Sequence, residues 1–155
     1  MERDKLLQGM DTGKALFGLF FAFGNRLQAA GDAFYEEITC KQFFLLICLS
    51  LFTEEPPTIN DLSRVMGSSH QNVKQIVNKL EKSGFVMTLC DQEDKRKIRV
   101  MPTEKLAELG EKYEQQENEF MKQFYEGISE EELQLTFRVM SKLESNLIDI
   151  RRKCE

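Results

Sequence analysis

Residues 58–100 of this 155-residue chain have the sequence TINDLSRVMGSSHQNVKQIVNKLEKSGFVMTLCDQEDKRKIRV. The opening TIND is a capping box, in which the first and fourth residues satisfy each other's free backbone donors, so it predicts the start of a short helix. Gly67 ends that helix, and Ser68 or Ser69 caps the next one. Gly84 follows the second helix as the residue type that best closes a helix. This stretch therefore predicts a helix, a tight turn and a second helix.

A β-hairpin is predicted directly after the second helix. Residues 85–90 and 97–101 alternate or are rich in β-forming side chains, and the charged turn 91–96 joins them. The predicted order is therefore helix, turn, helix and hairpin, which places a polar helix face beside a basic hairpin.

Positive charge is concentrated in this middle part of an acidic chain. The whole chain has a net charge of −5. Residues 68–103 hold seven Lys and Arg against four Asp and Glu, a net +3, whereas residues 1–67 carry −3 and residues 104–155 carry −5. A local basic patch can bring an acidic protein to DNA while the acidic flanks limit indiscriminate binding.

The second helix of the stretch is amphipathic, and its polar face is suited to DNA. Apolar side chains at helical spacing predict the buried stripe: Val73, Ile76, Val77 and Leu80. The opposite face is made of amides and lysines: Gln71, Asn72, Lys74, Gln75, Asn78, Lys79 and Lys82. Amides can pair with adenine edges, and lysine reaches guanine or phosphate. An ordinary solvated helix is the alternative.

In a helix-turn-helix the first turns of the second helix face the bases. We therefore expect the following residues to contact bases and phosphates: Ser69, His70, Gln71, Lys74 and Gln75. His70 is the only histidine, and its neighbours favour a contact with DNA over a metal ligand, although a surface imidazole can also be without a role.

The hairpin carries four cations: Lys95, Arg96, Lys97 and Arg99. A charged turn is usually just solvated, but this one follows a candidate recognition helix, and arginine is favoured in a narrow minor groove. We expect Asp94 to pair with a neighbouring cation and hold the shape of the tip.

The remaining segments are predicted to be helical. Helices are expected over residues 12–35, from the capping box 39–42 to the stop at 54–57, from 104 onward, and from the capping box 129–132 onward. The first is Phe-rich on more than one face, so it must be buried against more than one neighbour. A hydrophobic core or a partner subunit is favoured there over a cofactor pocket. The fold class is mainly α with a small β-hairpin wing.

Five motifs together resemble the MarR family of winged helix-turn-helix regulators. In order they are TCKQF (39–43), LSRVMGSSHQNV (62–73), LEKSGFV (80–86), DQEDKR (91–96) and VMPTE (100–104).

The resemblance implies one MarR-like domain over 1–155. Within it, a winged helix-turn-helix lobe spans 39–102, and helices in 1–38 and 103–155 form a dimerisation lobe. It also implies a homodimer in which Gln71, Asn72 and their neighbours, Asn78 included, enter the major groove and Arg96, between Lys95 and Lys97, the minor groove. The implied function is a transcriptional regulator, more often a repressor, that binds a near-palindromic operator and responds to a small aromatic or apolar effector.

Other functions receive less support from the residues. No Ser/His/Asp set, phosphate-cradling Gly loop or carboxylate pair points to an enzyme, and no cofactor is expected.

The four cysteines have no zinc-ligand spacing, and a reducing cytoplasm is expected. Glu2 and Asp4 argue against a signal peptide. Cys40, at a helix start that favours a thiolate, is the best redox candidate, with an inert thiol as the preferred alternative. A winged-helix module that binds proteins instead of DNA is the second functional reading.

Overall fold

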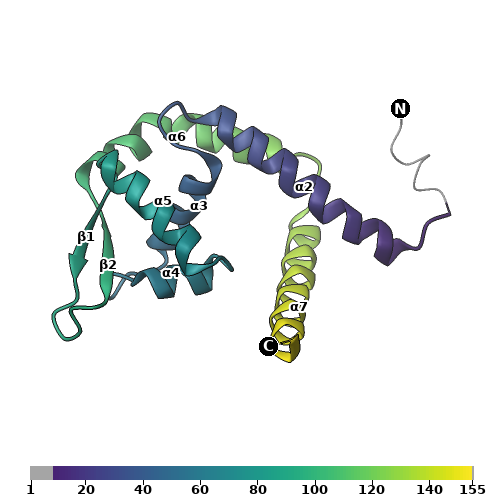
Figure 1. Cartoon of the computed structure of the whole chain (residues 1–155). Coiled ribbons are helices and arrows are strands. Elements are labelled where there is room, and N and C mark those ends of the chain that lie inside the picture. The colour runs from purple at the N-terminus through teal and green to yellow at the C-terminus, as the bar shows by residue number, and fades with distance from the viewer. Residues whose placement is uncertain (1–8, 155) are drawn as a thin grey trace. The chain divides into compact units, whose positions relative to one another are not determined.

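The computed structural model describes residues 9–154 (Figure 1). Its elements are α2 (Thr12–Phe34), α3 (Cys40–Ser50), α4 (Ile59–Val65), α5 (His70–Lys82), β1 (Val86–Cys90), β2 (Ile98–Pro102), α6 (Glu104–Phe124) and α7 (Glu130–Cys154). The predicted order of elements and the mainly α class with a β-hairpin are confirmed. Glu2 and Asp4, on which the expectation about a signal peptide depends, lie outside the described residues.

The predicted capping boxes begin the helices where the sequence placed them. Thr39 and Gln42 exchange backbone and side-chain hydrogen bonds of 2.8 and 3.3 Å at the start of α3. The box that opens α4 is also reciprocal. Helix α3 ends at Ser50, earlier than the prolines that were expected to stop it, so those prolines follow the helix and do not terminate it.

The core of the winged part is built by α3, α4, α5 and the hairpin, which lie together in Figure 1. Each contributes fully buried aliphatic side chains, among them Leu45, Leu62, Leu80 and Val100, all with an exposed fraction of 0%. Because every element supplies part of one core, the α5 helix and the hairpin are held in fixed positions relative to each other.

The hairpin is antiparallel, with Thr88 opposite Val100. An isolated bridge between Thr58 and Arg99 adds a third short segment to its edge, and the Val100 N–H donates to Pro57 O at 2.9 Å. The sequence did not predict this segment. It joins the loop before α4 directly to β2.

Chain contacts divide the molecule into two compact units, Met1–Leu109 and Gly110–Glu155. In the first unit, α2 packs on α3, and a Cβ at Gly31 would lie 2.6 Å from Cys40 Sγ, so the two helices approach closely there. Even so, α2 holds no buried residue: Phe17 is 62% and Phe21 65% exposed. The expectation that this helix is buried is therefore not met within one chain.

In the second unit, α7 resembles α2 in exposing its apolar side chains. None of its residues is buried, and Phe137 and Leu147 are 74% and 62% exposed.

Between residues 9 and 154, no helix is long and apolar enough to cross a membrane. The same residues include no group of three His, Cys, Asp or Glu side chains placed to hold a metal ion.

Candidate nucleic-acid interface

The turn between α4 and α5 fixes where the candidate recognition helix begins. Gly67 has φ +61°, a left-handed conformation that glycine adopts without a steric cost. The Ser68 N–H donates to Ser63 O at 3.0 Å, which closes the turn. Ser69 then caps α5, because its hydroxyl accepts the Asn72 N–H at 3.2 Å. Of the two serines that the sequence offered, Ser69 is thus the cap.

Helix α5 separates its apolar and polar side chains as predicted. The four stripe residues are between 0% and 8% exposed: Val73, Ile76, Val77 and Leu80. Every predicted contact residue at or on this helix is exposed: Ser69, His70, Gln71, Asn72, Lys74, Gln75 and Asn78. The Asn72 amide already donates to Ser68 Oγ at 2.7 Å, so part of its hydrogen-bonding capacity is used inside the turn.

Asp91 organises the tip of the hairpin. Its carboxylate is only 7% exposed and accepts the backbone N–H groups of Glu93 and Asp94 at 2.9 and 2.8 Å. These hydrogen bonds, that from Asp94 above all, together with the Arg99 guanidinium, lower the pKa of Asp91 from 3.8 to about 2. The tip is therefore held by a carboxylate that stays ionised over the physiological range.

Arg99 differs from the other cations of the hairpin, because it is committed to contacts inside the protein. Its guanidinium binds the Asp91 carboxylate, donates to Pro56 O at 2.6 Å and pairs with Glu55 at 2.6 Å. The sequence grouped it with three cations of the tip, yet it ties the hairpin to the loop before α4. Its pKa is raised, mainly by the hydrogen bond to Asp91, so it remains a permanent cation.

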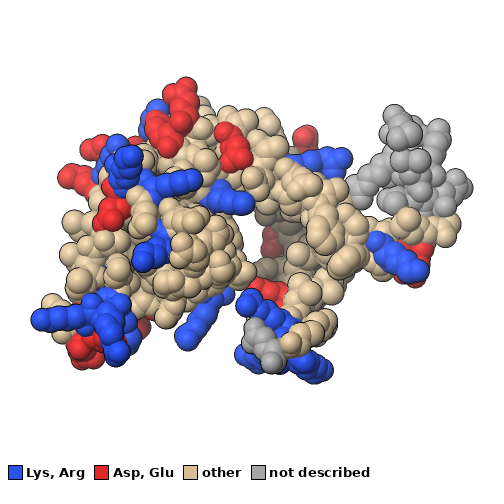
Figure 2. Space-filling view, in the orientation of Figure 1, with Lys and Arg blue, Asp and Glu red and all other residues tan. Residues whose placement is uncertain are grey.

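The remaining three cations of the tip point into solvent. Lys95, Arg96 and Lys97 are exposed, and the Arg96 side chain is 91% exposed. The expected pairing of Asp94 is confirmed: its carboxylate accepts from Arg96 Nε at 3.1 Å. Figure 2 shows Lys and Arg side chains gathered at the end of the hairpin, with acidic side chains beside them.

A contact that the sequence did not predict joins α5 to the hairpin. Glu81, the only acid of α5, accepts the Thr88 backbone N–H at 2.9 Å and the Thr88 hydroxyl at 2.5 Å. These two bonds connect the end of the helix to the middle of β1. The outward face of α5 and the base of the hairpin are thus linked by polar contacts as well as by the core.

The environment of Cys40 does not favour a thiolate. The pKa of the thiol is raised, first by burial and second by the carboxylate of Asp32. The position at a helix start suggested the opposite shift, and the packing of α2 against α3 outweighs it. The raised pKa favours the inert thiol, which was the preferred alternative, over a redox role for this residue.

Two helices joined by a tight turn and followed by a hairpin on the same core define a winged helix-turn-helix. Residues 38–98 match the model of the MarR family. Members of the family are DNA-binding transcription regulators and not enzymes.

Solved structures of this fold cover nearly the whole chain. A MarR protein from Peptoclostridium difficile is similar with a TM-score of 0.77 at 21% identity, over 95% of each chain. A MarR/EmrR-family transcriptional regulator from Acinetobacter sp. ADP1 has a TM-score of 0.77 at 22% identity, over 90% of this chain and 99% of its own. MepR from S. aureus, solved with DNA, has a TM-score of 0.72 at 22% identity, over 83% of this chain and 95% of its own.

Proposed function

We propose that this chain is a sequence-specific DNA-binding regulator. The observation that carries the proposal is the common surface formed by the outward side of α5 and the hairpin. The helix face is polar and almost free of acids, and Glu81, its single acid, is engaged by Thr88. A solvated helix with no ligand usually carries acidic and basic pairs instead.

Each element has a distinct role in this proposal. The amides and cations at the start of α5 read bases in the major groove and bind phosphates: Ser69, His70, Gln71, Asn72, Lys74, Gln75 and Asn78. The cations of the tip bind in the adjacent minor groove: Lys95, Arg96 and Lys97. Arg99 does not contact DNA in this proposal; its contacts with Asp91 and the loop before α4 hold the wing in place. MepR, which has the same fold, was solved in complex with DNA, and this supports DNA binding by a chain of this fold.

The functional form in this proposal is a homodimer. Large apolar side chains are exposed along α2 and along α7, such as Phe21 at 65% and Phe137 at 74%. Soluble monomers rarely expose contiguous apolar surface of this kind. We propose that helices within 1–38 and 103–155 bury it against a second copy. A two-fold dimer would present its recognition helices about 34–36 Å apart, or a multiple, to a near-palindromic operator.

Repression and control by a small apolar or aromatic effector complete the proposal, together with a cytoplasmic location. Repression and effector control depend on the match to the MarR family model. The cytoplasmic location depends on the cysteines, whose spacing predicts a reducing compartment. An effector can act only if it binds one arrangement of the dimer better than another.

The proposal is tested by selecting DNA fragments from a random library with the purified chain, then titrating the selected sequence by fluorescence anisotropy. A two-fold symmetric consensus, bound at least about a thousandfold more tightly than a scrambled duplex, is expected. Equal affinity for both duplexes would reject sequence-specific regulation. No affinity for either would favour the alternative, a winged-helix module that binds proteins.

A further inference from the structure

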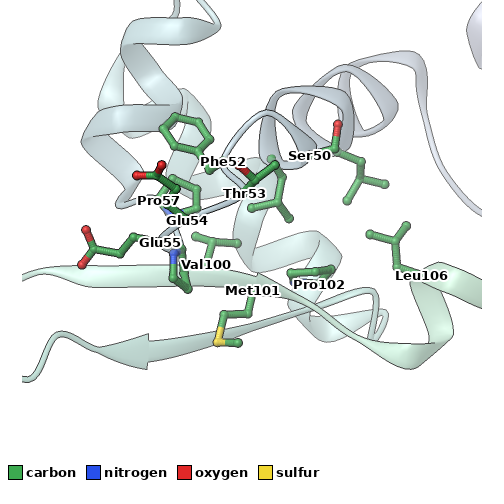
Figure 3. A pocket seen from close by; sticks show the side chains of 13 residues that line it. Ser50, Phe52, Thr53, Glu54, Glu55, Pro57, Val100, Met101, Pro102 and Leu106 are labelled. Carbon is green, nitrogen blue, oxygen red and sulfur yellow. The ribbon is translucent and has the colours of Figure 1, made fainter.

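A cavity of about 240 Å³ lies within the winged part, at the root of the hairpin (Figure 3). It opens between the end of α3, the loop that follows it, β2 and the first turn of α6. Its floor is apolar and well packed: Leu46, Leu49 and Val100 are 7%, 5% and 0% exposed. Phe52 and Leu106 complete the apolar lining. The volume is slightly below the ~300–1,000 Å³ of typical small-molecule pockets, so the cavity fits only a small apolar body.

The charge around this cavity has one sign. Among the described residues that line it, the only charged ones are Glu54 and Glu55, and none is Lys or Arg. Figure 3 shows both carboxylates at the end of the cavity near Phe52, with Pro102 and Leu106 toward the other end. The Phe52 ring offers a face that attracts cations. The lining therefore combines an apolar body with a negative rim on one side.

We propose that this cavity binds a small organic cation, in which an aromatic or alkyl body carries an amine or quaternary ammonium group. The body would fill the space over Leu49 and Val100. The cationic group would lie at the rim between Glu54 and Glu55. An anion of the same size would meet two carboxylates, of which only Glu55 is paired with a cation, Arg99, so the charge of the rim sets the specificity.

The same cavity is connected to the DNA-binding wing through one ion pair. Glu55 lines it and also pairs with Arg99 Nη2 at 2.6 Å, and Arg99 in turn holds Asp91 at the tip. A bound cation competes with Arg99 for Glu55 and so weakens one of the contacts that tie the wing to the loop before α4; the hydrogen bonds to Pro56 O and Pro57 O remain. This second step rests on the proposed DNA-binding function.

The size of that effect is limited, because Glu55 is 69% exposed and its pair with Arg99 is screened by water. Arg99 keeps its contacts with Asp91 and Pro56 O when Glu55 is drawn away. We therefore expect the cation to weaken DNA binding by about two- to fivefold, and DNA to weaken cation binding by the same factor. The ligand would modulate affinity and would not switch it off.

Binding is tested first without DNA, by NMR titration of the full chain with benzyltrimethylammonium and, separately, with benzoate. The cation should shift signals of cavity residues in a saturable way, and benzoate should not. Glu54→Gln should weaken the cation about threefold, whereas Glu108→Gln, an exposed carboxylate outside the cavity, should leave it unchanged. Equal response to both probes, or equal affinity of both variants, would overturn the site.

A second variant blocks the space while leaving the charges in place. Ser50 is an exposed residue on the lining, so Ser50→Trp should fill the cavity with little effect on the core. Loss of cation binding in Ser50→Trp, with an unchanged thermal transition, supports a bound body in the cavity. Retained binding would show that the cation associates elsewhere and would overturn the proposal.

Coupling to the wing is then measured on a DNA sequence selected by the wild-type chain. Saturating benzyltrimethylammonium should raise the Kd for DNA two- to fivefold in the wild type and leave it unchanged in Ser50→Trp. An unchanged Kd in both would overturn the coupling through Glu55. Because cation binding is measured without DNA, failure of the DNA-binding proposal and failure of the cation site give different results.

Discussion

Helices α5 and α7 both carry apolar side chains at helical spacing, but only one of them finds a core within the chain. The apolar stripe of α5 is buried, with Leu80 at 0% exposure, whereas Phe137, Leu147 and Ile150 of α7 remain 74%, 62% and 57% exposed. An amphipathic pattern thus predicts that a surface will be covered and does not say by what. The apolar stripe of α5 is buried by the core of the winged part. For α7 we propose that a second copy of the chain buries the apolar side chains.

The largest expected effect comes from breaking the proposed interface on α7. Phe137→Glu places a charge at the most exposed large apolar side chain of α7, so the dimer should dissociate at micromolar concentration. Each monomer would then hold one half-site alone, and affinity for a two-fold operator should fall by about a hundredfold or more. Sedimentation velocity and anisotropy titration measure the two losses.

Lys142→Glu is the matched control, because it places a new carboxylate on the same helix at an exposed charged position. It should leave the dimer intact. A Phe137→Glu chain that remained dimeric would show that α7 does not form the interface.

A matched pair of leucine truncations sharpens the contrast between the two helices. Leu80→Ala removes a fully buried side chain and should lower the free energy of unfolding by about 2–5 kcal/mol at any protein concentration. Leu147→Ala, in an exposed position, should cost little in the monomer and destabilise the protein only through loss of the dimer. Urea unfolding at two concentrations a hundredfold apart separates the two. A destabilisation of Leu80→Ala relative to the wild type that changed with concentration would contradict this account, because only the dimer interface responds to concentration.

Most of the fold was predictable from the sequence, because its signals are local. The capping box of Thr39 and Gln42, the cap at Ser69 and the glycine at Gly84 each act within about four residues. The outward face of α5 was predictable for the same reason, since the positions of Val73 and Ile76 fix the direction of every other residue on a helix.

The contacts that shape the wing were not predictable, because they join residues far apart in the chain. Arg99 donates to the carbonyl of Pro56, 43 residues earlier, and nothing in the local sequence distinguishes it from Arg96. The contact of Glu81 with Thr88 and the raised pKa of Cys40 likewise depend on packing. The composition therefore predicted the basic region. Only the structure distinguished Arg99, which is bound inside the protein, from the exposed cations of the tip.

The base-reading role of α5 is tested with Gln71→Ala. If the amide pairs with an adenine edge, its loss should remove about 1–3 kcal/mol of preference at one position in each half-site, with a smaller loss of total affinity. Selection from a randomised operator measures the preference. Gln115→Ala, an exposed amide on α6, serves as the control and should select the wild-type sequence. A wild-type consensus from Gln71→Ala would remove this residue from the interface.

Arg96 and Arg138 are two exposed arginines, one on the wing tip and one on α7. Arg96→Ala should weaken binding to all sequences and reduce the slope of log K against log salt by about one unit, because one phosphate contact is lost. Arg138→Ala should leave the slope unchanged. Titrations at four salt concentrations give both slopes. Parallel lines for the wild type and Arg96→Ala would mean that the tip does not contact DNA.

The smallest expected effect is the pH dependence of the wing. The pKa of Asp91 is lowered to about 2 in the folded protein, so its carboxylate contributes stability that is fully present above the ordinary pKa of 3.8. That contribution is lost as the pH falls from about 4 toward 2. Asp91→Asn lacks the ionisable group, so the difference in Tm between the wild type and the variant should be constant above pH 4 and shrink below it. A difference that stayed constant down to pH 2 would show that the ionised carboxylate of Asp91 does not stabilise the hairpin.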